Sequence, residues 1–439
     1  MSACVTALLV SSSHAADLAY EISGGAGHTD NINRVEVGEQ EEDIGLVGLR
    51  LSLNQQSART QADVRGNVSY YDYLDDTYDS EVLGNLAANA TFAIVPERFV
   101  WSASDYFGQV LRDPFQPSTP ENRENVNQLA TGPDVIVALG AQTSIRLSGR
   151  YILSTYEDSP FDSDTISAGL GLSRSLSEAS AVSLNYEAQQ TEFDEQGLDA
   201  DYDQSEAFVR YQTAGARTTF SADVGYTELE RDASLDSEGG LLLRLETARR
   251  ISPASVVSLN AGREFANSGS AFASAQGFGS VDVGNVSGQQ TTEPFTNDYV
   301  AASWDYSRNR TGLGLGVSYN EQKYDVSNEL DQTLLSVTAL ASRQMSQRTS
   351  LSVALIYSDG SFERPGGDYD DIGSTLSFAW RLSQRLSLSA KYDHWRRSSE
   401  QPNGDYEENR IWLTLAYGTG VVRSRAALPQ FSVDQVRAP

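Results

Sequence analysis

Many segments of this chain alternate apolar and polar side chains, and the connections between them are of two kinds that follow one another strictly by turns. One kind is short and carries Arg, Ser or Gln, as at 96–98 and 383–385. The other is longer, acidic and bears Gly or Pro, as at 194–204 and 359–371. A strand meander that crosses a bilayer sorts its turns in this way, because its two ends face different compartments.

The alternation predicts an all-β fold in which every strand has one apolar and one polar face. Val182, Leu184 and Tyr186, for example, alternate with Ser183 and Asn185. Successive strand side chains point to opposite faces, and a sheet in lipid has to close because its open edges could not be hydrogen-bonded. We therefore expect a single antiparallel up-and-down transmembrane β-barrel of roughly twenty strands (~18–22), with both termini periplasmic. Expected strands include 126–140, 205–214, 386–396 and 409–418.

A set of soluble tandem β-sandwiches, such as an adhesin, is the alternative fold. It predicts large apolar side chains on the inward faces, which have to pack against each other. The second face of these strands carries Gly, Ser, Asn, Thr, Asp and Arg instead. Such a face lines water rather than a core, so the barrel is the favoured interpretation.

The first and last predicted strands divide the chain into three parts. Residues 1–16 are expected to be a signal peptide, because an apolar run precedes small residues, although basic residues are missing before that run. Residues 17–418 are expected to form the transmembrane barrel, and 419–439 a periplasmic C-terminal tail. The single cysteine, Cys4, lies in the first part, so disulfides are not expected.

The formal net charge is −28, from 60 acidic and 32 basic residues. A protein that tracks nucleic-acid phosphates has the opposite balance, so no nucleic-acid partner is expected. The acidic residues concentrate in the longer connections, which fits a face exposed outside the cell. We expect the outer membrane of a Gram-negative bacterium as the location.

The strand register predicts a set of charged side chains in the lumen. The lumen-lining candidates are Arg50, Asp63, Arg65, Arg146, Arg150, Glu187, Arg210, Asp223, Arg244, Glu246, Asp305, Lys391 and Asp393, and Glu21 is assigned to the same face. Basic and acidic members balance, which suits neutral or weakly charged hydrophilic cargo. The same residues could instead pair across strands and stiffen the wall.

Two connections are longer than the others, 113–123 with three prolines and 267–296, rich in Gly, Ser and Gln. Such a loop can fold into a barrel as a constriction, and the second is the better candidate. An external loop without a fixed structure is the alternative.

No catalytic or metal-binding motif stands out. The chain has no G-x-S-x-G, H-E-x-x-H or P-loop string, so it is not expected to be an enzyme and no cofactor is expected. His28 near Asp30 is too sparse for zinc. Asp199, Asp201 and Asp203 alternate like the start of a calcium loop, but the glycine and closing glutamate are missing, so a solvated acidic loop is the better interpretation and no metal is expected.

Two stretches in the first third carry a family resemblance. The first is D-N-x-N-R, and the second runs from T-P-x-N-R-x-N-x-N to T-G-P-D. Their residues are Asp30, Asn31, Asn33, Arg34, Asn122, Arg123, Asn125, Asn127, Gly132, Pro133 and Asp134. The chain thereby resembles the β-barrel porin type 2 group, outer-membrane barrels associated with exopolysaccharide or PEP-CTERM clusters. The resemblance implies no catalytic residues. One departure is that the aromatic-ended strand 411–417 is followed by a further tail.

These observations lead to an expected function without covalent chemistry. The leading hypothesis is an outer-membrane channel for hydrophilic cargo that takes part in exopolysaccharide export. A general or cation-preferring diffusion porin and a plugged, anchoring barrel of the envelope are the alternatives. Expected partners are outer-membrane lipid and lipopolysaccharide, the barrel assembly machinery, and polysaccharide with periplasmic export components.

Overall fold

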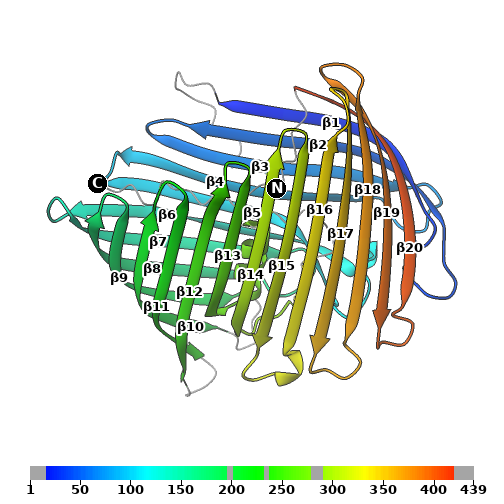
Figure 1. The fold of residues 1–439 in the computed structure, drawn as a ribbon. Coiled ribbons are helices and arrows are strands. Elements are labelled where there is room, and N and C mark those ends of the chain that lie inside the picture. Colours follow the sequence, from blue (N-terminus) through cyan, green and yellow to red (C-terminus); the bar gives the residue numbers. More distant parts are fainter. Residues whose placement is uncertain (1–15, 195–200, 232–236, 278–289, 420–439) are drawn as a thin grey trace.

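The computed structural model describes residues 16–194, 201–231, 237–277 and 290–419. Their strands form one closed barrel of twenty antiparallel strands (Figure 1). The predicted fold class, an up-and-down barrel of roughly twenty strands, is confirmed. Residues 1–15 of the predicted signal peptide, with Cys4, lie outside the described residues, as do most of the predicted tail and Asp199.

The strands are 12 to 16 residues long and follow the chain in order around the ring. They are β1 (Asp17–Thr29), β2 (Glu42–Gln56), β3 (Thr60–Tyr73), β4 (Glu81–Val95), β5 (Phe99–Leu111), β6 (Arg123–Ala138), β7 (Thr143–Tyr156), β8 (Ser163–Ser177), β9 (Ser180–Phe193), β10 (Tyr202–Ala214), β11 (Thr218–Arg231), β12 (Ser237–Ser252), β13 (Ser255–Ala266), β14 (Phe295–Arg308), β15 (Thr311–Lys323), β16 (Gln332–Gln344), β17 (Thr349–Phe362), β18 (Tyr369–Arg381), β19 (Leu386–Ser399) and β20 (Tyr406–Gly418).

The ring is closed by the first and last strands. β1 pairs antiparallel with β20 from Glu21 opposite Gly418 to Thr29 opposite Arg410. Strand β1 begins, and β20 ends, at the end of the barrel where the short turns lie, whereas the longer connections all lie at the other end. We call these the short-turn end and the loop end. That the short-turn end faces the periplasm remains a prediction.

The two faces of the wall differ in the way that the alternation predicts. Outward positions carry apolar side chains that are exposed on the isolated chain, such as Leu184, Tyr186, Val224 and Leu355. Inward positions alternate with them and are mostly polar. The small apolar clusters of buried side chains form where loops meet the inner wall near the loop end. The apolar outer face is therefore the surface that lipid would cover.

Several strands reach further toward the loop end than the sequence predicts. Strand β6 begins at Arg123 rather than 126, β10 at Tyr202 rather than 205, and β20 at Tyr406 rather than 409. Polar side chains stand on both faces there, which hides the alternation, while the backbone ladder continues. The prediction of these ends was wrong because it relied on the apolar face alone.

The helices of the described residues are short. They are η2 (Pro120–Asn122), α1 (Ser268–Gly277) and η3 (Asn328–Leu330), all in connections at the loop end. Within the described ranges, none of the helices is long and apolar enough to span a membrane.

Inward aromatic rings lie against glycines directly across the ladder. A methyl group at Gly27 would overlap the Trp412 ring, and one at Gly262 would overlap Tyr299. The same pairing joins Gly360 with Tyr369 and Gly373 with Trp395. The glycine gives the ring room to lie flat on the wall.

The pair at the seam between β1 and β20 gives a test. Gly27→Ala forces Trp412 off the wall and is expected to destabilise the barrel by about 1–3 kcal/mol. Gly24→Ala is the matched control, because its methyl group points outward and would have only the Leu46 carbonyl oxygen nearby, 3.9 Å away. Urea unfolding of the barrel in lipid measures both, and equal midpoints for the two variants would contradict this account of the seam.

Candidate functional site

The loop end of the barrel is crossed by connections that fold inward. The 267–294 connection between β13 and β14 carries α1. Asn267 starts this helix, because its Oδ1 accepts a hydrogen bond from the Ser270 backbone N–H (2.8 Å). The Asn267 amide also donates to the Tyr202 hydroxyl on β10 (2.7 Å). The start of the helix is thus fixed against the inner wall.

Helix α1 then reaches a distant part of the wall. The Phe272 ring is 1% exposed and packs against Val110, Val126 and Tyr156, which belong to β5, β6 and β7. The whole run from β8 to β12 separates these strands from β13, where the connection begins. The connection therefore crosses the opening, as expected of a constriction loop.

The other long connection, 112–122 between β5 and β6, also crosses the opening. Its Phe115 packs edge-on against Phe362 of β17 (ring centroids 4.9 Å apart) and contacts Tyr369 of β18. Asn122 shapes the loop, because its amide donates to the carbonyl oxygens of Asp113 (2.8 Å) and Pro117 (3.1 Å). Both long connections thus narrow the same end of the lumen.

The D-N-x-N-R residues hold a third inward connection, 30–41, to the last strand. The Asp30 carboxylate accepts two hydrogen bonds from Asn409 of β20, each 2.7 Å, and the buried Asn31 amide donates to the Glu407 carbonyl oxygen (2.9 Å). The Asn33 amide donates within the loop, to the Gly38 carbonyl oxygen (3.2 Å). These residues build the mouth and its seam.

Arg34 connects this loop to the one between β5 and β6. Its guanidinium group donates to the Glu408 carboxylate (2.9 Å) and to the Ser118 carbonyl oxygen (2.9 Å), and it lies over the Tyr406 ring. Burial opposes the charge, but Tyr406 and Glu408 hold the pKa of Arg34 above its ordinary value. The cation therefore stays charged and ties two inward loops together.

The T-G-P-D stretch marks an interruption in the wall. The ladder between β6 and β7 has no pairing at Gly132 and Pro133, because proline has no N–H to donate. Arg150 fills the gap: one nitrogen donates to the carbonyl oxygens of Pro133 (3.0 Å) and Gly149 (2.7 Å), and another to the Asp134 carboxylate (2.6 Å). The pair Arg150–Asp134 thus repairs the strand break.

The remaining motif residues stabilise strand ends near the mouth. Arg123 donates to the Glu81 carboxylate (2.6 Å). Asn125 accepts from the Gln109 amide (2.7 Å) and donates to Glu157 (2.6 Å). Asn127 lies beside Asp105.

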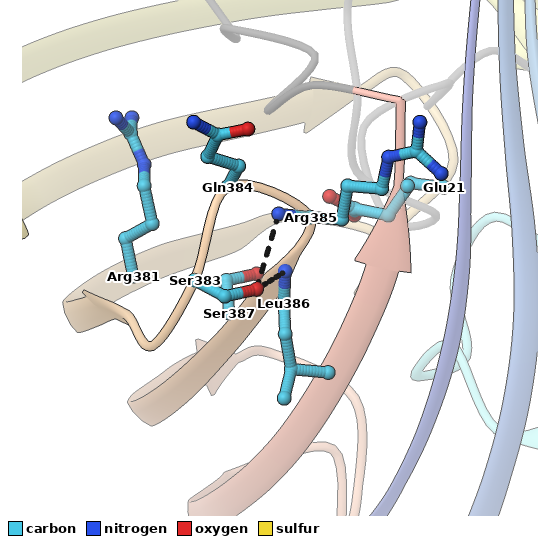
Figure 2. Close-up of a pocket in the computed structure, with 8 residues that line it drawn as sticks. Glu21, Arg381, Ser383, Gln384, Arg385, Leu386 and Ser387 are labelled. Atoms are coloured by element: carbon cyan, nitrogen blue, oxygen red, sulfur yellow. Dashed lines mark hydrogen bonds between the residues drawn. The ribbon is translucent and has the colours of Figure 1, made fainter.

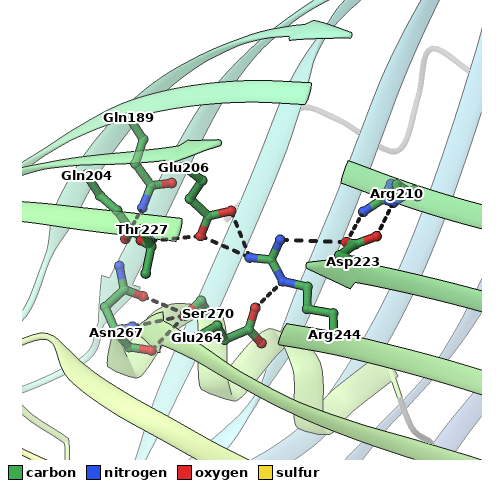
Figure 3. Close-up of polar contacts among 10 residues, drawn as sticks. All are labelled: Gln189, Gln204, Glu206, Arg210, Asp223, Thr227, Arg244, Glu264, Asn267 and Ser270. Carbon is green, nitrogen blue, oxygen red and sulfur yellow. Dashed lines mark hydrogen bonds and ion pairs between the residues drawn. The ribbon is translucent and has the colours of Figure 1, made fainter. Parts of the chain in front are cut away.

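A group of charged side chains on the inner wall spans β9 to β13. Figure 3 shows Glu206, Arg210, Asp223, Arg244 and Glu264 of this group near Asn267 and Ser270 at the start of α1. We call this group the wall cluster. Its members are Glu187, Glu206, Arg210, Asp223, Arg244, Glu246 and Glu264. Arg210 makes two hydrogen bonds to Asp223, each 2.7 Å. Arg244 lies between Glu206 (3.0 Å) and Glu264, and 4.0 Å from Asp223.

All thirteen predicted lumen residues lie on strand positions that alternate with the outward apolar ones. Most have an ion partner: Arg50 pairs with Glu21 (3.4 Å), Arg65 with Asp63 (3.1 Å), Lys391 with Asp393 (3.0 Å), and Arg150, Arg210 and Arg244 as given above. Among the described residues, Arg146, Glu187, Glu246 and Asp305 have no ion-pair or hydrogen-bond partner. These four side chains are the free charges of the predicted set.

Sequence reasoning missed Glu206 and Glu264. Glu206 stands an even number of residues from Arg210, and Glu264 holds the same relation to Asn260, so the strand alternation places both on the inner face. The signal was present, but both lie near the loop end of their strands, where polar residues occur on both faces.

A small hollow lies at the opposite, short-turn end (Figure 2). Glu21, Arg381 and the turn 383–387 line it. The Ser383 hydroxyl accepts the backbone N–H groups of Arg385 (3.3 Å) and Leu386 (3.1 Å), which tightens the turn. This geometry is that of a structural turn.

Two of the residues considered for metal have structural partners. His28 lies 2.8 Å from Asp43 on the outer rim, and Asp201 accepts the Phe193 backbone N–H (2.9 Å). In the described part of the chain, no three His, Cys, Asp or Glu side chains gather as a metal ion would require.

The fold and the two faces define a membrane-spanning β-barrel with a polar lumen and an inward-folded mouth. The sequence matches no protein-family model and no curated protein.

Among solved structures, the chain is similar to the siderophore receptor PirA from Pseudomonas aeruginosa, with 12% identity and a TM-score of 0.43 over 91% of this chain and 80% of that chain. It is also similar to the FrpB iron transporter from Neisseria meningitidis (8%, TM-score 0.46, 91% and 81%). A third is OccK2 from P. aeruginosa, in complex with glucuronate (12%, TM-score 0.36, 92% and 98%). At these values the likenesses say nothing about cargo.

Arg150 offers a test of the strand repair. Arg150→Met leaves the Pro133 and Gly149 carbonyl oxygens without their donor, and we expect a loss of about 1–3 kcal/mol. Arg146→Met is the control on the same strand and face, since that side chain has no partner among the described residues. Urea unfolding in lipid should separate the two variants; a larger loss for Arg146→Met would refute the repair role.

The mouth also carries a pH-sensitive contact. A hydrogen bond with Glu238, then burial, raises the pKa of Asp325 to about 7. Between pH 3.8 and about 7 the folded protein keeps a proton that the unfolded chain has released. The stabilisation from this contact is therefore complete below about pH 4 and is lost as the pH rises to about 7. We expect the thermal midpoint to fall between pH 5 and 8 by more in wild type than in Asp325→Asn. Identical pH profiles would show that the pair does not share a proton.

Proposed function

We propose that this protein is an outer-membrane channel of a Gram-negative bacterium that passes small hydrophilic solutes and prefers cations. The observation that carries the proposal is that the closed barrel wall is apolar on its outer face and polar on its inner face. Apolar side chains stand outward on strand after strand, and polar side chains alternate with them inward. A wall of this kind separates lipid from water and needs no covalent chemistry.

The free charges of the wall support the preference for cations. Paired charges act at a distance as weak dipoles, so the unpaired ones dominate the field in the lumen. Glu187, Glu246 and Asp305 are free carboxylates, whereas Arg146 is the free cation among the predicted lumen residues. The wall cluster also has five carboxylates and two guanidinium groups. Carboxylate-lined pores favour cations.

The inward loops support small solutes over a polymer. Phe272 and Phe115 each carry a connection across the opening to a distant wall. Exopolysaccharide export is the leading hypothesis from the sequence, and only the family resemblance points to polysaccharide as the cargo. We therefore favour a diffusion channel for small solutes over polysaccharide export. That polysaccharide is the cargo remains a prediction from the sequence.

Reversal potentials in planar bilayers test the selectivity. In a KCl gradient, wild type is expected to favour K⁺, and Glu187→Gln with Glu246→Gln should move the reversal potential toward zero. Arg146→Gln is the matched control, because removing a free cation should move it the other way. An anion-selective wild type, or a double variant that behaves like wild type, would sink the proposal.

Single-channel conductance tests the role of the loops. Phe272→Ala removes the ring that fixes α1 to β5–β7, so we expect a larger or noisier open conductance. Phe378→Ala, on the outer face of β18, is the control and should leave the conductance unchanged. If wild type and Phe272→Ala both stay closed, the barrel is plugged, and the anchoring role replaces the channel.

A further inference from the structure

The outer face of the barrel has two edges, and these edges differ in charge on strands β13 to β16. On β15, Thr311 and Glu321 both point outward and lie ten residues apart, with the exposed side chains of Leu315 and Val317 between them. Ten residues of a tilted strand rise about 25 Å, which is the height of the apolar band in barrels of this kind. Thr311 therefore marks the edge of the band at the short-turn end, and Glu321 marks the edge at the loop end.

At the loop-end edge, the outward cations of these strands are paired with carboxylates. Arg263 of β13 lies 3.6 Å from Asp298 of β14, and Lys323 of β15 lies 2.7 Å from Glu321. The pairs neutralise this edge, so it offers no excess of positive charge to a lipid headgroup.

At the short-turn edge, the cations of the same strands have no carboxylate beside them. Arg308 is the last residue of β14, Arg310 lies in the turn that follows, and Arg343 lies near the end of β16. All three side chains are exposed, and none has an ion-pair partner among the described residues. The turns at this end from β10 to β19 contain no Asp or Glu, although the chain has 60 acidic and 32 basic residues. The chain itself therefore leaves this positive charge unbalanced.

The strand ladder gathers these arginines in one place. Arg308 lies opposite Thr311, and Thr311 lies opposite Arg343, so the two arginines stand in one row, two strands apart. Strand spacing puts roughly 10 Å between their backbones. The Arg343 guanidinium donates to the Thr311 hydroxyl (3.2 Å) and so leans toward Arg308, while the Arg310 carbonyl oxygen accepts the Gln344 N–H (2.8 Å), which holds the turn beside Arg343. We call Arg308, Arg310, Thr311 and Arg343 the arginine patch.

The arginine patch lies at the level where lipid headgroups begin. Trp304 and Tyr306 stack on each other on the same face of β14, just before Arg308 (ring centroids 6.1 Å apart). Tyr and Trp rings of this kind occupy the boundary between the apolar band and water. Like charges on neighbouring positions of a sheet repel, and an anion between them removes that cost. Arginine N–H groups also match the spacing of phosphate oxygens.

We propose that the arginine patch binds the phosphate group of an anionic phospholipid in the leaflet at the short-turn end. The guanidinium groups donate to the phosphate oxygens, and the next outward residues, Leu313 and Ala341, contact the acyl chains. A zwitterionic headgroup binds less well, because the three cations repel its ammonium group. The site does not depend on which solute passes the lumen. Phospholipid is the source of the phosphate because the sequence predicts that the short-turn end faces the periplasm, away from lipopolysaccharide.

Native mass spectrometry in mild detergent tests the site with dioleoyl phosphatidylglycerol and dioleoyl phosphatidylcholine, which have the same acyl chains. Wild type is expected to bind phosphatidylglycerol more tightly. Replacing all three arginines of the patch (Arg308→Gln, Arg310→Gln and Arg343→Gln) should lower the apparent affinity for phosphatidylglycerol by roughly tenfold or more, and that for phosphatidylcholine by much less.

The matched control replaces Arg59, Arg98 and Arg174 by Gln. It removes the same charge from exposed positions at the same end of the barrel, but on separate parts of the wall, and should bind phosphatidylglycerol as wild type does. Equal losses in the two triple variants would show a diffuse charge effect and overturn the proposal. Equal wild-type affinity for the two lipids would leave the patch to an acidic protein, and tighter binding of lipid A than of phosphatidylglycerol would replace phospholipid by lipopolysaccharide; both results also overturn it.

Fluorescence quenching in liposomes gives a second, local test. In a Cys4→Ser background, a fluorophore on Ala341→Cys lies beside Arg343 on the outer face, and one on Ala103→Cys lies on the outer face of β5, away from the patch. The vesicles contain equal amounts of phosphatidylglycerol and phosphatidylcholine, one of which is brominated. At Ala341→Cys, brominated phosphatidylglycerol should quench about twofold more than brominated phosphatidylcholine, whereas at Ala103→Cys the two should quench alike. The same ratio at both positions contradicts a lipid site at the patch.

Discussion

The hydrogen-bonded pairing of β1 with β20 is the constraint on which the rest of the structure depends. In a bilayer no water is present to satisfy an open strand edge, so the sheet is stable only when its first and last strands meet. The seam is built for this contact: Trp412 lies flat against Gly27, and Asp30 holds both the backbone and the side chain of Asn409. Every other feature, from the lumen to the mouth, presupposes that the ring is closed.

The strands and their order could be predicted from the sequence because a period of two is a local signal. Val182, Leu184 and Tyr186 show which face is apolar without any knowledge of their neighbours. The destinations of the loops could not be predicted in this way. Phe272 and Phe115 find their partners on strands far along the chain, and nothing near either residue identifies them. The pairing of Arg244 with Glu206 and Glu264 could likewise not be predicted, because these residues lie on three different strands whose register is known only from the fold.

The motif residues turn out to serve architecture. Asp30, Asn31 and Arg34 hold an inward loop to β20, Asn122 shapes a second loop, and Asp134 holds the Arg150 that bridges the strand break at Pro133. None of them is arranged as a catalytic group would be. Residues that resemble a family can therefore mark the parts of a barrel that are hardest to build rather than the parts that handle cargo.

The contact of the first loop with the last strand also sets an order of events. Asp30 and Asn31 are made near the start of the chain, but their partners Asn409 and Glu407 arrive with the final strand. Arg34 belongs to the same loop and donates to Ser118 of the 112–122 connection. Neither loop can make its final contacts before β20 has joined the sheet. We therefore expect the connections 30–41 and 112–122 to reach their final positions only after β20 has paired with β1.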